Sequence, residues 1–326
     1  MKKNPGIHIA TAMLPAAFGL ASVVGMPSSA PKTAAHAVGA AKQFSIPISN
    51  LSNWAGTVIV SINGVKIEGH SPVHAQNADC EMHLGAHTPV FNGAPNGLVL
   101  EPMNACVQPF PGQTSQSNTD WTSFGDALVN AAGTVTASGV PRIWPEHLVG
   151  GGASNPDHAV ELHPLTALTD SNGKNFDFSA NVFAGGFSGG LSQATAEKIV
   201  QQLAVSVTRN SGSVDISFTA GTIGNFTVLN ITIERDSIAS DGAGSFSMDG
   251  EVSSVPVRIV TAKGSPINDE VQRFKSGPND KITMDALVLF SLSPQALLDA
   301  ANKSHGDSVA VEHPIQLILY GTPDDQ

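Results

Sequence analysis

The segments AVELHPL (residues 159–165) and AVEHPI (residues 310–315) decide the predicted fold, because one pattern closes each half of the chain. A β-branched stretch at residues 134–143 and a polar insert precede the first segment. A strand-like stretch at residues 282–290 and a short helical pattern precede the second. Such a recurrence indicates duplication of one small β-barrel. The alternative, that two common residue pairs recur by chance, stays open.

Short strands and many turns are predicted for both halves. The chain has 32 Gly and 21 Pro, and only 13% of its residues are charged, a composition that favours turns over long helices. The dipeptide Asn63-Gly64 lies between β-branched runs and predicts a hairpin. Apolar spacing predicts one helix at residues 192–203, capped by Ser192, and a shorter one at residues 294–301.

The first 37 residues read as a secretory signal peptide. Lys2 and Lys3 precede an apolar stretch at residues 9–26, and AHA at residues 35–37 fits cleavage before Val38. Cleavage after Ala40 is the alternative site. We therefore predict a periplasmic or extracellular protein. Its parts are a signal peptide (1–37), a flexible lead-in (38–50), a first β-barrel domain (51–170) and a second β-rich domain with one helix (171–326).

Charge restricts the class of partner. Residues 38–326 contain 13 Lys and Arg against 27 Asp and Glu, a net charge of −14. Such a surface repels phosphate backbones, so nucleic acid is not an expected partner. No stretch after the signal peptide is apolar enough to predict a membrane span.

The two cysteines, Cys80 and Cys106, are predicted to form a disulfide, since an even count in an exported protein favours pairing. On the chain-entropy account, such a bond contributes roughly 3 kcal/mol. Two free, buried thiols are the alternative.

Three segments carry a resemblance to a known group of proteins. DCEMHL (residues 79–84), EPMNAC (residues 101–106) and ELHPL (residues 161–165) resemble motifs of uncharacterised exported bacterial proteins. The resemblance covers roughly residues 55–168 and implies a small closed barrel of the oligonucleotide/oligosaccharide-binding (OB) type. This sequence departs from the pattern at Leu165, where Val is usual, and at Cys80. The resemblance implies no reaction. The predicted fold class is thus mainly β: two consecutive small OB-like barrels or sandwiches, each with a minor helix.

Histidines and carboxylates make up the first candidate site. His83 and His87 are four residues apart, and with Glu161 they could hold a divalent metal, the cofactor that this pattern suggests. His70 and His74 have the same spacing, but neither pair contains the Glu of the helical zinc-protease motif, and nearby prolines argue against helices. Scattered loop histidines are the alternative.

A second interpretation uses the same strands for acid–base chemistry. Glu161 and His163 alternate along one strand and share a face, as do Glu81 and His83 on another. A mixed patch of this kind can transfer protons near neutral pH, so Glu161 and His163 are candidate catalytic residues and Glu81 and His83 candidate ligand-binding residues. In the alternative, His163 donates a hydrogen bond across the barrel.

Gly186-Phe187-Ser188-Gly189-Gly190 fits the G-x-S-x-G pattern of a nucleophile elbow, which makes Ser188 a third candidate for catalysis. The strands that follow do not fit an α/β-hydrolase. A glycine-rich turn is the competing interpretation.

Function is the least determined property. The barrel prediction favours an exported accessory or binding protein for carbohydrate, another cell-envelope polymer or a small molecule, with Trp144 as a stacking surface. The alternative is a secreted hydrolase, either metal-assisted through the His/Glu residues or serine-based through Ser188.

Overall fold

A computed structural model describes residues 36–37, 42–76, 78–91, 95–182, 190–219 and 222–322. The predicted signal peptide lies outside these ranges except for His36–Ala37, the strand β1, which pairs with β11 (Thr222–Ile223). Within the described ranges, no helix is long and apolar enough to cross a bilayer.

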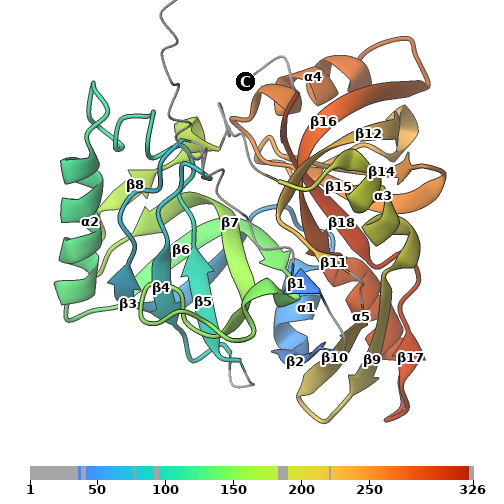
Figure 1. Cartoon of the computed structure of the whole chain (residues 1–326), viewed down its shortest axis with the longest axis horizontal. Coiled ribbons are helices and arrows are strands. Elements are labelled where there is room, and N and C mark those ends of the chain that lie inside the picture. Colours follow the sequence, from blue (N-terminus) through green and yellow to red (C-terminus); the bar gives the residue numbers. More distant parts are fainter. Residues whose placement is uncertain are drawn as a thin grey trace, which may run out of the picture. The chain divides into compact units, whose positions relative to one another are not determined.

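The first half forms a closed five-stranded barrel (Figure 1). The strands pair in the order β5-β4-β3-β6-β7, and a parallel pairing of β7 with β5 closes the ring. Helix α2 (Asn118–Asn130) connects the third strand to the fourth and begins at Ser117, whose side chain accepts a hydrogen bond from the backbone of Asp120. The barrel strands are β3 (Val60–His70), β4 (Leu84–His87), β5 (Gly97–Leu100), β6 (Val135–Ile143) and β7 (His158–Thr169), with β8 (Asn175–Asp177) and the short helices η1 (Pro145–His147) and η2 (Ser179–Asn181) beside them.

The second half forms a barrel with the same strand order. Its first strand pairs with the second and the fourth, and its third strand pairs in parallel with the fifth. Helix α4 (Pro266–Lys275) occupies the same connection as α2. The strands are β12 (Phe226–Glu234), β14 (Phe246–Val252), β15 (Val255–Thr261), β16 (Lys281–Leu292) and β18 (Ile315–Gly321), with β13 (Ala239–Ser240) and η3 (Arg235–Ser237) between them. Two consecutive OB-like barrels are thereby confirmed.

The sequence similarity between the two halves does not mark equivalent positions. The fourth strands end at Ile143, which pairs with Val160, and at Leu292, which pairs with Ile315. Glu161 therefore corresponds to Gln316 and not to Glu312, which lies outside the strands with an exposed side chain. The two halves thus repeat the same strand order. The similar residues in their sequences, however, lie four positions away from the structurally equivalent ones.

A smaller sheet joins distant parts of the chain in the order β17-β9-β10-β2. The flexible lead-in predicted at residues 38–50 is corrected here: from Lys42 onward it forms β2 and the start of α1. Phe44 and Ile46 of β2 are buried, which explains why this segment pairs with β10. The elements are β2 (Lys42–Pro47), β9 (Ala204–Arg209), β10 (Ser213–Thr219), β17 (Val309–Ala310), α1 (Ile48–Trp54), α3 (Gln193–Gln202) and α5 (Pro294–Lys303).

The hairpin predicted at Asn63-Gly64 is wrong. Both residues lie inside the continuous strand β3, and the register with β6 shifts between Ile62 and Val65. Gly64 has φ of +70°, which a glycine adopts without strain, so the dipeptide forms a bulge.

An apolar cluster joins the outer faces of the two barrels, with Met103 and Val140 from the first and Leu289, Ile318 and Tyr320 from the second among its members. Hydrogen bonds also join the two barrels beside this apolar cluster. The Tyr320 hydroxyl donates to the carbonyl of His163 over 3.1 Å, and the backbone N–H of Ile143 donates to the Ser291 hydroxyl over 3.0 Å. The first barrel's charged residues are next to this contact.

Candidate functional site

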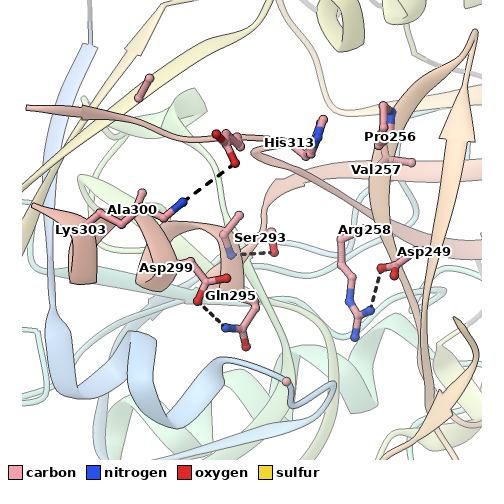
Figure 2. A pocket seen from close by; sticks show the side chains of 14 residues that line it. Asp249, Pro256, Val257, Arg258, Ser293, Gln295, Asp299, Ala300, Lys303 and His313 are labelled. Carbon is pink, nitrogen blue, oxygen red and sulfur yellow. Dashed lines mark hydrogen bonds and ion pairs between the residues drawn. The ribbon is translucent and has the colours of Figure 1, made fainter.

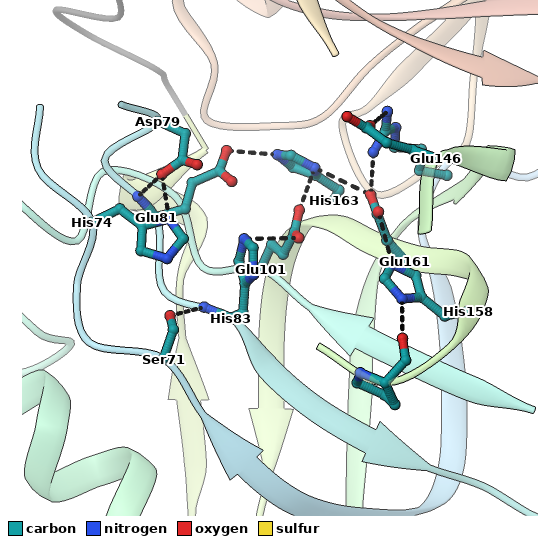
Figure 3. A network of polar contacts seen from close by, with 12 residues as sticks. Ser71, His74, Asp79, Glu81, His83, Glu101, Glu146, His158, Glu161 and His163 are labelled. Carbon is teal, nitrogen blue, oxygen red and sulfur yellow. Dashed lines mark hydrogen bonds and ion pairs between the residues drawn. The ribbon is translucent and has the colours of Figure 1, made fainter. Parts of the chain in front are cut away.

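Three segments that are far apart in the sequence converge at one end of the first barrel (Figure 3). They are residues 79–83, residues 101–106 and the strand β7. The backbone of Glu101 donates to Leu162 over 3.1 Å, and Leu165 donates back to Glu101 over 3.0 Å. The predicted disulfide between Cys80 and Cys106 is present and ties the first segment to the second. These links bring the charged side chains of the three segments together, whereas Met82 and Leu162 point into the apolar core.

His163 lies at the centre of the resulting network and is completely buried. Its Nε2 is 2.9 Å from Oε1 of Glu81, and its Nδ1 is 2.5 Å from Oε2 of Glu101. The second contact is a close charge pair that falls outside hydrogen-bond geometry, since Nδ1 has no hydrogen-bond partner. Burial opposes the charged imidazole, yet the carboxylates of Glu81 and Glu101 raise the pKa of His163 well above 6.5.

Arg142 anchors the other side of the network. Its guanidinium lies 2.6 Å from Glu161 and 3.0 Å from Glu146, and it donates to the carbonyl of Phe290 in the second barrel over 3.0 Å. His158 contacts Glu161 at 3.0 Å. Burial opposes ionisation of Glu161, but the charge of Arg142 and the hydrogen bond from His158 hold its pKa well below 4.5. Burial likewise opposes the charge on His158, and Glu161 raises its pKa.

Opposite charges are paired within this network. Burial raises the pKa of Glu81 to about 8, against the opposing charge of His163. Burial also disfavours the charge on Glu101, but His163 and His83 hold its pKa below the ordinary value. The guanidinium of Arg142 thus lies against the carboxylate of Glu161, and the imidazole of His163 against that of Glu101. Such pairing of opposite charges is what allows so many ionisable groups to be buried together.

The predicted catalytic pair lies inside this network. Glu161 has 2% of its surface exposed and His163 has none. Both side chains are fully engaged with the protein's own charges, and a reacting group must come within hydrogen-bond reach of an acid or base. The geometry therefore favours a structural role, in which His163 bonds across the barrel end to Glu81.

The exposed edge of the network holds His74, Asp79 and His83. Nδ1 of His74 is 2.6 Å from Oδ1 of Asp79, and the two imidazole rings are 4.6 Å apart. The hydrogen bond to Asp79 raises the pKa of His74, whereas burial lowers the pKa of His83. One ligand atom from each of these three residues lies within 4.8 Å of the others, as also holds for Glu81, His83 and Glu101 and for Glu101, Glu161 and His163.

The remaining predicted site residues lie elsewhere. His87 pairs with Glu68 at 2.7 Å and belongs to none of the three potential metal-binding groups found among the described residues. Trp144 is 1% exposed and packs between Phe218 and Phe290, so its indole has no face open to a ligand. Ser188 lies outside the described residues.

A pocket of about 530 Å³ lies on the second barrel (Figure 2). Strands β14 and β15 contribute Asp249 and Arg258, which pair at 3.0 Å. The connection between the fourth and fifth strands supplies the opposite wall through α5, with Gln295 donating to Asp299 over 2.9 Å. Other lining residues are Gly56, Pro256, Val257, Ser293, Ala296, Ala300, Lys303, Ala310, Glu312 and His313.

Sequence reasoning missed Arg142, His158 and the whole pocket. The candidates chosen from histidine spacing included His87 but not His74, although both belong to i, i+4 pairs. Glu101 stands within the segment EPMNAC that carries the family resemblance, and this was the available signal for it. The pocket residues form no recognisable motif, because they come from two adjacent strands, the distant helix α5, the segment at residues 310–313 and Gly56.

No protein-family model matches this chain, no curated protein matches it, and no solved structure matches it.

Proposed function

We propose that this chain is an exported binding protein whose second barrel holds a neutral, hydroxyl-rich segment of a cell-envelope polymer, a carbohydrate in particular. Export is inferred from the basic start, apolar stretch and AHA site of the first 37 residues. The Cys80–Cys106 disulfide supports an oxidising compartment. Membership of the group of exported bacterial proteins named above is part of the same proposal.

The position of the pocket carries this proposal. Barrels of the OB type bind extended polymers on the face of their second and third strands, beside the connection between strands four and five. The pocket has Asp249 and Arg258 on these two strands and α5 in that connection. Its volume of about 530 Å³ is within the range of small-molecule and oligomer sites.

The charges around the pocket indicate the class of ligand. Three carboxylates and two cationic side chains line it, and most are already paired with one another. Arg258 is paired with Asp249 at 3.0 Å, and Lys303 is 3.9 Å from Glu312. A strongly charged ligand would have to compete with these pairs. Hydroxyl groups, in contrast, can donate to the carboxylates and accept from the cations without separating them.

The equivalent face of the first barrel is closed by the chain itself. A Cβ atom added to Gly85 would overlap the carbonyl of Ala153, and one added to Gly69 would lie 2.7 Å from the same residue's backbone. The backbone of Asp157 and the ring of Pro156 cover Gly97 in the same way. This difference supports placing the proposed binding on the second barrel.

Co-sedimentation of the purified full-length mature chain with peptidoglycan sacculi and with chitin tests this function. We expect saturable binding to at least one polymer, weakened at least tenfold by Gln295→Ala and by Arg258→Ala. Gln272→Ala and Arg273→Ala alter exposed residues of the same types on α4 and should leave binding unchanged. The proposal fails if neither polymer binds saturably, or if the pocket variants bind as tightly as their controls.

A further inference from the structure

We propose that His74, Asp79 and His83 form a zinc site in the connection between the first and second strands of the first barrel. This inference does not depend on the proposed polymer binding, because the site and the pocket are on different barrels. Two imidazoles, one carboxylate and a place for water form a donor set that suits Zn²⁺.

The distances fit an ion after a small adjustment. One ligand atom from each of the three side chains already lies within 4.8 Å of the other two. Tetrahedral zinc with bonds of ~2.1 Å places its ligand atoms ~3.4 Å apart. The 2.6 Å contact between His74 and Asp79 would have to lengthen, and the ion would replace the proton that these residues share.

The surrounding chain holds the three side chains in place. The backbone N–H of His74 donates to the carbonyl of Glu81 over 2.8 Å, and that of His83 donates to the Ser71 hydroxyl over 3.0 Å. Cys80 follows Asp79 directly and is fixed by its disulfide to Cys106. The described residues of this loop, 71–76 and 78–83, are thus held at both ends and by the disulfide, which lowers the entropy cost of gathering ligands.

Burial and charge favour this group of residues as a metal site over the fully buried group of Glu101, Glu161 and His163. The side chains of His74, Asp79 and His83 are 26%, 25% and 17% exposed, so an ion can reach them. Glu161, in the deeper group, is already bonded to Arg142, and a dication beside that guanidinium would be repelled.

Glu101 supports His83 from the buried side. Its Oε1 is 3.4 Å from Nε2 of His83, while its Oε2 contacts His163. A carboxylate at this position can orient an imidazole that binds a metal. Zinc would therefore connect the exposed loop to the buried charges of the barrel through a single carboxylate.

Metal analysis of the mature full-length chain, stripped with EDTA and dialysed against Zn²⁺, tests the site. We expect one zinc per chain for the wild type and at least a tenfold loss of affinity in His74→Ala, His83→Ala and Asp79→Asn. His87→Ala is the matched control and should retain zinc. Replacing Zn²⁺ with Co²⁺ should give the visible absorbance of a tetrahedral site, which provides a readout on the unmutated protein.

The outcomes separate a metal site from a folding defect. Circular dichroism and thiol titration establish that each variant is folded with its disulfide intact, and Asp79→Asn preserves side-chain size if the alanine variants do not fold. The proposal is overturned if the wild type binds no stoichiometric zinc. It is also overturned if Asp79→Asn binds zinc as tightly as the control His87→Ala. Sedimentation with polymer after EDTA treatment reports separately on the pocket.

Discussion

The two barrels share one strand order but differ in the chemistry of the same outer face. On the first barrel this face carries Glu81, His83, Glu101, Glu161 and His163. Strand pairing gives Ser245, Ser247, Val260, Gln316 and Ile318 as the corresponding residues of the second barrel. One copy thus presents an ionic network and the other small, amide or apolar side chains. A single fold accommodates both because the charged side chains of the network are paired, whereas an unpaired buried charge would be costly.

The largest effect is expected at Arg142, whose counterpart on the second barrel is Ser291. Removal of the guanidinium in Arg142→Ala leaves Glu161 buried without its main cation and should cost about 3–5 kcal/mol. Ser291→Ala removes a neutral hydroxyl that accepts from the N–H of Ile143 and should cost less, about 1–3 kcal/mol. Urea unfolding measures both, with exposed Arg273→Ala as the control. Equal losses at Arg142 and Ser291 would mean that the charged face is no more demanding than the neutral one.

An effect of intermediate size is expected on the pH dependence of the free energy of unfolding. The folded-state pKa of Glu161 lies well below its unfolded value of about 4.5, so its contribution is present above pH 4.5 and disappears as pH falls through the folded pKa. We expect the stability difference between wild type and Glu161→Gln to shrink by up to about 1.4 kcal/mol per pH unit in that acidic window. Unfolding by urea at pH 7, 5, 4 and 3 measures it.

Glu312→Gln, which changes an exposed carboxylate outside the network, provides the control and should follow the wild type at each pH. A difference between wild type and Glu161→Gln that stays constant down to pH 3 would contradict the assigned pairing.

The smallest effect concerns the helix that both barrels place between strands three and four. Ser117 caps α2 through its side chain, whereas Ser265 at the start of α4 makes no such cap. Ser117→Ala should therefore lower the free energy of unfolding by about 1 kcal/mol. Thermal unfolding measures this, and Ser115→Ala, an exposed neighbour, should have no effect. An unchanged melting temperature would show that packing alone fixes α2.

Local sequence patterns predicted those elements well whose formation does not depend on residues far away in the sequence. Apolar spacing predicted helices at residues 192–203 and 294–301, which are α3 and α5, and Ser192 caps α3 as expected. The hairpin at Asn63-Gly64 failed because β6 pairs along both sides of the bulge, a long-range contact that a dipeptide cannot encode. Helix α2 was not predicted, although Trp121 and Phe124 on it are buried.

The candidate site was harder to predict, because its contacts join distant residues. Glu81 and His163 are separated by 82 positions in the sequence and meet at 2.9 Å. Strand alternation correctly grouped Glu161 with His163 on β7, whereas Glu81 and His83 lie in the connection before β4 and not on a strand as predicted. Alternation also could not show that both pairs point toward the second barrel. Histidine spacing paired His83 with His87, whereas the loop folds back to place His74 next to His83.

Residues 150–157 cross the outer face of the first barrel at Gly69, Gly85 and Gly97, so this face is covered by the protein's own chain. Because these three glycines lack side chains, the main chain of residues 153–157 packs directly against the strands in the place where a ligand would otherwise bind. On the proposed function, the chain would then have one polymer-binding barrel and not two. Avidity for a repetitive polymer would have to come from several molecules acting side by side and not from the tandem arrangement within one chain.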